Sequence, residues 1–215
     1  MNTLKTFISA ILAGMSVGFG GTVFLSVENR VIGAALFTIG LFAVCTFGFH
    51  LFTGKVCYVF HNDRAYALAL PVIWLGNVVG TGIVALLFHL TRNASIAEKA
   101  MTLCQVKLDD SLLSLFVLGI LCNIFIYIAV EGYMRNPHEL GKYLSLFFGV
   151  MVFILCGTEH CVADMFYFWM AGAWSAKAVL CIVMISLGNA VGGVLLPLLR
   201  AFATNKEAVR VGSAR

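Results

Sequence analysis

Long apolar runs in series are the feature that most constrains what this chain can fold into. They lie at approximately 6–27, 31–59, 66–90, 111–130, 143–174 and 177–200. A run of about 20 apolar residues is what an α-helix needs to cross the hydrocarbon core of a bilayer. Because backbone in lipid must satisfy its own hydrogen bonds, the runs form helices. The sequence therefore predicts an all-α membrane protein with six transmembrane helices, in a single domain over residues 1–215.

Composition supports this class and argues against others. The chain is 61% hydrophobic and 11% charged, whereas a soluble domain averages about 25% charged residues. The net charge of +4 gives no support for nucleic-acid binding. The seven cysteines form no C-x-x-C motif, and most lie in apolar runs. We interpret them as small packing residues and expect no metal or cofactor.

The basic residues in the connections predict the orientation. An even number of spans puts both termini on one side of the membrane, and cytoplasmic loops carry the excess of Lys and Arg. The side with the termini holds eight basic residues and the other side holds five, so we predict cytoplasmic termini. The first set is Lys5, Arg64, Arg135, Lys142, Arg200, Lys206, Arg210 and Arg215, and the second is Arg30, Arg92, Lys99, Lys107 and Lys177.

Two of the runs are too long and too interrupted to be single helices. The second contains "GFHLFTGK" and the fifth contains "GTEHCVAD". Interrupted backbone at membrane depth must be buried in protein or line an aqueous path, and ionisable residues there are costly and usually functional. We therefore predict a pore that passes both breaks, with Leu51, Phe52 and Thr53 at the first and Glu159 and His160 at the second.

The two halves of the chain resemble each other. "WLGNVVGTGIVALLF" (74–88) matches "SLGNAVGGVLLPLL" (186–199), with Asn77 and Asn189 in register. Three spans per half is an odd number, so the halves, about 6–90 and 111–200, face opposite ways across the membrane. This pattern predicts an inverted repeat, in which paired broken helices meet at the functional site.

Four stretches then resemble one known family. They are "HLFTGKV" at the first break, "GILCN" (119–123), "GTEHCVADMF" at the second break, and L-G-N-x-x-G-G (187–193). In order and over nearly the whole chain, they are similar to the formate/nitrite transporter family, which also includes hydrosulfide channels. The resemblance implies an aquaporin-like helical bundle that assembles as a homopentamer with one pore per protomer. It implies passage of small monovalent anions of weak acids, such as formate, nitrite or hydrosulfide, across the cytoplasmic membrane of a prokaryote.

The same resemblance implies roles for polar residues. His160 matches the central pore histidine, and Thr53 matches the threonine that hydrogen-bonds toward it. Asn123 matches a polar residue near the pore, and Lys107 matches a lysine of the vestibule.

Apolar constrictions are implied in the same way. Phe153 matches an aromatic residue of one constriction, to which we also assign Leu51 and Phe52. Phe37 and Leu41 match the other constriction.

Several residues depart from the family pattern. The family usually has Glu or Asp where this chain has His50, Asn where it has Asp164, and an aromatic residue where it has Thr158. From the residues themselves we expect Glu159 to bond backbone amides and so support the second break. We expect Asp164 to cap the half-helix that follows, and His50 to brace its loop.

These residues suggest how an anion would cross. An anion that enters an apolar constriction loses its hydration, which costs several kcal/mol or more. Lys107 would attract it to the mouth by long-range electrostatics, and His160 would then donate a hydrogen bond or a proton. The sequence does not decide whether the proton comes from His160 or from water.

Three other functions remain open at this point. A proton-coupled secondary transporter would use nearly the same residues. A membrane redox subunit could use His50 and His160 as haem or metal ligands. A water or glycerol channel of the aquaporin type is less consistent, since the chain lacks N-P-A motifs and has only three prolines. The resemblance implies a protein that is not an enzyme and hydrolyses no nucleotide, and the absence of a Walker motif agrees with the latter.

Overall fold

A computed structural model describes residues 2–204, and this part of the chain is helical, which confirms the all-α prediction. The tail residues of the charge count (Lys206, Arg210 and Arg215) and the two ends of the predicted domain lie outside the described residues. The elements are α1 (Thr3–Ser26), α2 (Arg30–Phe47), α3 (Phe52–Val56), the 3-10 turn η1 (Val59–His61), α4 (Arg64–His89), α5 (Ile96–Asp109), α6 (Leu112–Arg135), α7 (Glu139–Leu155), α8 (Cys161–Ala171) and α9 (Ala176–Thr204).

The predicted broken helices are confirmed. The second apolar run divides into α2 and α3, and the fifth divides into α7 and α8. Helices α1, α2, α4, α6 and α9 are long and apolar enough to cross a membrane, whereas the break leaves α7 with 17 residues and α8 with 11. The six predicted spans therefore correspond to four continuous helices and two interrupted ones.

Helix α5 lies in the polar connection between the third and fourth predicted spans, where the sequence analysis assigned no helix. Its buried residues are Ile96, Ala100, Cys104 and Lys107, which recur at the spacing of one helix face. That face packs against α8. Because the segment is polar overall, its narrow row of buried residues was not recognised as one face of a helix.

Short polar side chains define several helix starts. Asn29 accepts hydrogen bonds from the backbone N–H groups of Val31 and Ile32 at α2. Ser111 accepts one from Ser114 at α6. These caps satisfy N–H groups that the first turn of a helix leaves without partners, so they fix where the chain turns into each span.

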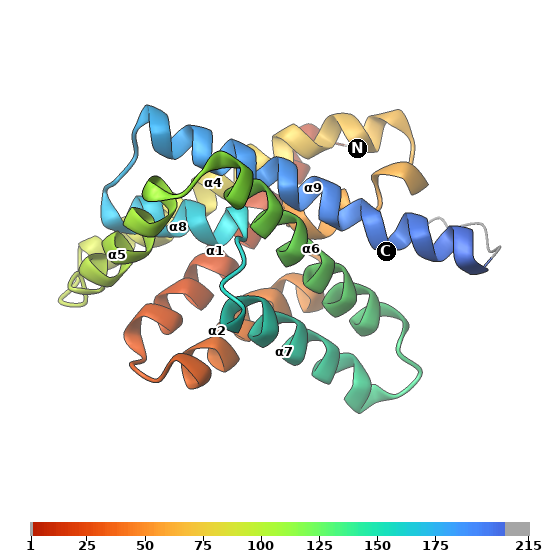
Figure 1. The fold of residues 1–215 in the computed structure, drawn as a ribbon, viewed down its shortest axis with the longest axis horizontal. Helices are drawn as coiled ribbons and strands as arrows, with labels where there is room; N and C mark the ends of the chain where they lie inside the picture. The colour runs from red at the N-terminus through yellow and green to blue at the C-terminus, as the bar shows by residue number, and fades with distance from the viewer. Residues whose placement is uncertain (1, 205–215) are drawn as a thin grey trace.

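The two halves of the bundle repeat the same packing. Helix α1 packs on α4 and α2, and α6 packs on α9 and α7 in the same way. Helices α2 and α7 meet between the halves, while α5 lies at the left end of the view in Figure 1 and the end of α9 lies at its right. The predicted inverted three-helix repeat is thus the architecture of the protein.

Glycines of the repeated L-G-N-x-V-G motif permit the closest of these contacts. A Cβ atom at Gly80 would overlap the backbone carbonyl oxygen of Ile11 on α1. A Cβ at Gly192 would overlap the carbonyl oxygen of Ile120 on α6 in the same way. Small residues let membrane helices approach until their backbones touch, and van der Waals contact is the main attraction available to helices in lipid.

Candidate functional site

Each break begins at a glycine with a left-handed backbone. Gly48 has φ 70° and Gly157 has φ 67°, a conformation that other residues adopt only with strain. The chain then continues in extended conformation through Leu51 and His160, which immediately precede α3 and α8. The two breaks are therefore built on the same local backbone plan.

A buried asparagine from the neighbouring helix holds the second break. Asn189 Oδ1 accepts a hydrogen bond from the backbone N–H of Cys161 at 2.9 Å. Its Nδ2 donates to the carbonyl of Glu159 at 2.9 Å and to that of Gly119 at 2.8 Å. One side chain thus satisfies backbone groups that the break would leave unpaired in an apolar interior.

Asn77 makes the same three bonds at the first break. Its Oδ1 accepts from the backbone N–H of Phe52 at 2.9 Å. Its Nδ2 donates to the carbonyls of Ala10 at 2.8 Å and His50 at 3.0 Å. The structure therefore explains why the two asparagines stand in register in the sequence, a function that the pattern alone did not reveal.

His160 lies where the two breaks meet. Its Nδ1 accepts a hydrogen bond from the backbone N–H of Ala163 at 3.1 Å, so the imidazole caps α8. Its Nε2 is 2.9 Å from Thr53 Oγ1 on the first break, as expected. Because Nδ1 is an acceptor, the neutral ring carries its proton on Nε2 and donates it to Thr53. Neither ring nitrogen is left free for the haem or metal that the redox alternative requires.

Aromatic rings extend from His160 across the interior. The ring of Phe153 stacks on the imidazole with centroids 5.6 Å apart. The ring of Phe37 meets Phe153 edge-on at 6.1 Å, and Phe24 meets Phe37 at 6.5 Å. The assignment of Phe37 and Phe153 to different constrictions was therefore wrong, because their rings are in contact. Phe24 was not singled out from the sequence, since one aromatic residue in an apolar helix carries no signal.

The other apolar candidates lie close by in the core. Leu41 and Leu51 are buried in the main hydrophobic cluster, and Phe52 packs against it partly buried. Their participation in a second constriction stays a prediction.

Asn123 connects the two halves of the molecule. Its Nδ2 donates to the carbonyl oxygen of Thr53 at 3.1 Å and to that of Asn189 at 2.7 Å. The amide thus positions the first break against α9, and its direct contact with a substrate stays a prediction.

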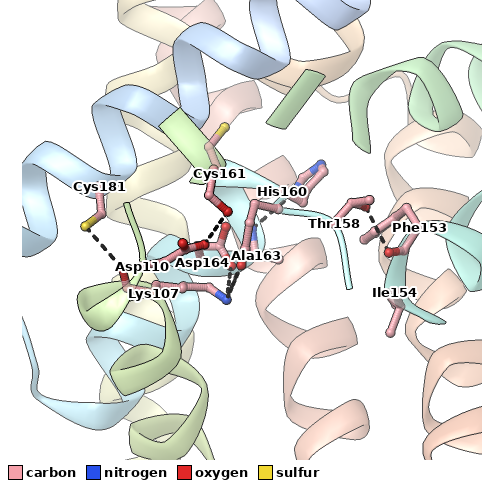
Figure 2. A network of polar contacts seen from close by, with 12 residues as sticks. Lys107, Asp110, Phe153, Ile154, Thr158, His160, Cys161, Ala163, Asp164 and Cys181 are labelled. Atoms are coloured by element: carbon pink, nitrogen blue, oxygen red, sulfur yellow. Dashed lines mark hydrogen bonds and ion pairs between the residues drawn. The ribbon is translucent and has the colours of Figure 1, made fainter. Parts of the chain in front are cut away.

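Lys107 reaches from α5 to the start of α8, as Figure 2 shows, and binds two carboxylates there. Its Nζ is 2.8 Å from Glu159 Oε2 and 3.4 Å from Asp164 Oδ1. The exposed fractions of Lys107, Glu159 and Asp164 are 6%, 7% and 2%. We define these three residues as the carboxylate–lysine cluster.

Two expectations are corrected by this cluster. Glu159 binds the Lys107 ammonium rather than backbone amides, because a charged donor gives a carboxylate a stronger hydrogen bond than a neutral N–H. Asp164 lies in the first turn of α8 and faces the same ammonium, while His160 provides the cap. The backbone of Glu159, rather than its side chain, supports the break, because its carbonyl accepts from Asn189 and its N–H donates to the carbonyl of Leu118 on α6 at 3.3 Å.

The charge of Lys107 is firmly retained. Burial alone would lower the pKa of Lys107, but attraction to Asp164 and Glu159 outweighs burial and raises the pKa above its ordinary value. Lys107 is nevertheless neutralised by its partners, so it is not the free cation at the mouth that the sequence suggested.

The other two residues that depart from the family pattern, His50 and Thr158, take part in hydrogen bonds of the backbone. His50 receives a hydrogen bond from Asn77 at its carbonyl, and its N–H donates to Ser9 Oγ at 3.1 Å, so its segment is braced on both sides. Thr158 Oγ1 donates to the carbonyl of Phe153 at 2.9 Å and so closes the end of α7.

A second polar cluster lies at the other end of α6. Glu131 accepts hydrogen bonds from Tyr58 Oη at 2.9 Å and from Arg200 at 2.8 Å, and pairs with Arg135 at 2.8 Å. The sequence analysis did not single it out, although an acidic residue near the end of an apolar run is a usable signal.

Residues 1–203 match the model of the formate/nitrite transporter family. The chain belongs to this family. It is 28% identical to the nitrite transporter NirC of Salmonella typhimurium over 90% of this chain and 81% of that protein. Among solved structures, it resembles an FNT family ion channel with a TM-score of 0.84 and 27% identity, covering 94% of this chain and 91% of that one. It also resembles a pentameric formate channel with formate bound, with a TM-score of 0.80 and 23% identity over 95% and 98% of the two chains.

Proposed function

We propose that this protein is a channel that passes small monovalent anions of weak acids, with formate, nitrite and hydrosulfide as the candidate substrates. The function is transport rather than catalysis. The observation that carries the proposal is the contact between His160 Nε2 and Thr53 Oγ1, which joins the two breaks beside an apolar wall of Phe153 and Phe37. Membership of a transporter family supports it.

The assembly and location follow from the relatives. The structure of similar fold is named as a pentameric formate channel, and we propose a homopentamer with one pore per protomer. Bacterial relatives named as nitrite transporters support a place in the inner membrane of a prokaryote. The bias of basic residues favours termini in the cytoplasm.

Thr53 and His160 supply the polar groups that an anion needs in this apolar segment. Because the imidazole donates to Thr53 Oγ1, the hydroxyl hydrogen of Thr53 is free to donate to a passing anion. The Nε2–H lies in the ring plane that the Ala163 contact fixes, so an anion beside Thr53 can share this donor with Thr53 Oγ1. Two donors thus replace part of the hydration that the anion loses.

His160 acts as a hydrogen-bond donor in this proposal and remains neutral. A second proton on the ring would have to sit on Nδ1, where it would face the backbone N–H of Ala163 and remove the cap of α8. The proton that neutralises a permeating weak acid therefore comes from the solution rather than from an imidazolium. This assignment resolves, as a proposal, the choice that the sequence left open.

Flux into proteoliposomes tests the proposed function. We expect formate, nitrite or hydrosulfide to enter faster than into empty liposomes, and chloride to enter much more slowly because it cannot take up a proton. Equal passage of chloride would contradict a weak-acid channel, and no passage of any of the three would contradict the proposal as a whole.

Proton-coupled transport is the alternative that shares these residues. Flux that saturates with substrate and always moves one proton per anion, even against an opposing gradient, would favour it. A channel instead passes anions in proportion to the gradient in both directions.

A further inference from the structure

We propose that Glu159 and Asp164 together bind one proton beside the pore, and that this proton controls anion passage, with acidification filling the site and increasing flux. The inference rests on the proposed function and adds a regulatory site to it. It concerns a residue particular to this chain, since Asp164 stands where the resembled family usually has Asn.

The carboxylate–lysine cluster has more negative than positive groups. Two carboxyl groups share a single ammonium, with Lys107 Nζ 2.8 Å from Glu159 and 3.4 Å from Asp164. All three side chains are more than nine-tenths buried. If both carboxyl groups are ionised, the buried cluster carries one net negative charge, which a low-dielectric interior strongly disfavours.

Among residues 2–204, Lys107 is the one cation that pairs with Asp164 or Glu159. The titratable side chains around Asp164 include the Tyr167 phenol and the thiols of Cys104, Cys122, Cys161 and Cys181, from α5, α6, α8 and α9. Near Cys181, Asp110 adds a further acid, and Lys177 at the start of α9 is exposed to solvent. Phenols and thiols are uncharged near neutral pH or become negative above it. The cluster therefore becomes neutral only by taking up a proton.

The geometry provides a place for that proton. Asp164 Oδ2 is buried and has no hydrogen-bond partner among the described residues. Glu159 Oε2 and Asp164 Oδ1 lie 2.8 and 3.4 Å from the same Lys107 Nζ, so the two carboxyl groups flank one ammonium. A proton bound by the pair would give Asp164 the hydrogen-bonding group that its buried Oδ2 lacks, and Lys107 would hold the remaining negative charge.

The site is placed to act on the pore. Glu159 directly precedes His160, and Asn189 fixes both the Glu159 carbonyl and the start of α8. A net negative charge next to the donor that receives the anion repels it, whereas the protonated cluster is neutral. Because the proton binds at low pH and leaves at high pH, flux should fall as the pH rises.

The first test compares formate flux for the wild type and Asp164→Asn at about pH 5.5 and about pH 7.5. Asp109→Asn is the matched control, because Asp109 is an exposed carboxylate on α5 that contacts Gln105 and not Lys107. We expect Asp164→Asn to raise flux at the higher pH by about five- to tenfold. Formate titrates identically in all samples, so a pH profile of Asp164→Asn that equals those of the wild type and the control would overturn the inference.

The second test does not depend on transport. Infrared difference spectra of the purified wild type should show a protonated-carboxyl band that disappears as the pH is raised. Asp164→Asn should lack this band, and Asp109→Asn should keep it. A wild type that conducts formate but shows no such band contradicts the proton site alone, whereas a band without any flux contradicts the proposed function alone.

Discussion

The two breaks have the same backbone structure but carry different side chains. Each begins at a glycine with positive φ, and each is held by one asparagine that makes three equivalent bonds. By these equivalent contacts, Leu51, His50 and Lys55 of the first break correspond to His160, Glu159 and Asp164 of the second. The first break therefore carries basic side chains, and the second carries two acids paired with Lys107 from α5.

This difference separates scaffold from chemistry. Both halves keep the two features that an interrupted helix needs in an apolar interior. These are a glycine with a left-handed backbone and a buried side-chain amide that bonds backbone groups on both sides of the break. The histidine that contacts Thr53 and the two carboxylates that bind Lys107 belong to the second half. A few side chains can thus give one break polar groups that the other lacks, although the backbone structure of the two breaks is the same.

Removal of either asparagine should have the largest effect. Asn77→Ala and Asn189→Ala each delete three hydrogen bonds and leave buried backbone groups unpaired, so each should lower the free energy of unfolding by about 3 kcal/mol or more. Thermal unfolding in detergent measures this, with the exposed Asn93→Ala as control. Similar losses would support the equivalence of the breaks, and a strong effect at only one position would refute it.

The motif glycines come next. Gly80→Ala and Gly192→Ala push a methyl group into a facing carbonyl, so each should destabilise the protein by about 1 to 3 kcal/mol. Gly54→Ala is the comparison, because a Cβ there would only reach ordinary contact with Val130. Unchanged melting temperatures for both motif variants would show that the helices do not pack this closely.

Thr53 tests the contact between the breaks. Thr53→Val keeps the shape of the side chain but removes the hydroxyl, so anion flux should fall by about tenfold, which corresponds to one lost hydrogen bond. Thr53→Ser retains the hydroxyl and should keep most of the flux. Equal flux for the Val and Ser variants would remove Thr53 from the conduction path.

Replacement of Thr158 should have the smallest effect on stability, and this effect should have no counterpart at the first break. Thr158→Ala removes the bond to the Phe153 carbonyl and should cost about 1 kcal/mol of stability. The corresponding residue of the first break is Phe49, which has no hydroxyl, so this bond is a true difference between the halves. Thermal unfolding measures the loss, and Thr102→Ala, at an exposed position of α5, is the control.

Much of the fold could be predicted because a helix that crosses the membrane interior must have a long run of apolar residues, which is visible in the sequence. Apolar length predicts spans, and the breaks at Gly48 and Gly157 interrupt that length visibly. Helix α5 was missed because only a narrow stripe, from Ile96 to Lys107, is buried. A test for helical spacing, applied to the polar connection as well as to the spans, would have found it.

The sequence predicted which residues form the candidate site better than it predicted which of them are in contact. The position of His160 in a break between apolar runs drew attention to it, and its partner Thr53 came from the resemblance. The pairing of Glu159 and Asp164 with Lys107 depends on how α5 folds over α8, and no local pattern encodes that contact. The shared wall of Phe37 and Phe153 likewise depends on the packing of α2 on α7.

The most direct test of the central claim is formate flux through His160→Asn in proteoliposomes. Asparagine is a good helix N-cap and can still accept the Ala163 N–H, but it lacks the imidazole Nε2–H that reaches Thr53. We expect a protein of normal stability whose formate flux is lower than that of the wild type by about tenfold or more. Wild-type flux in this variant would contradict the account, because the histidine would then only cap α8.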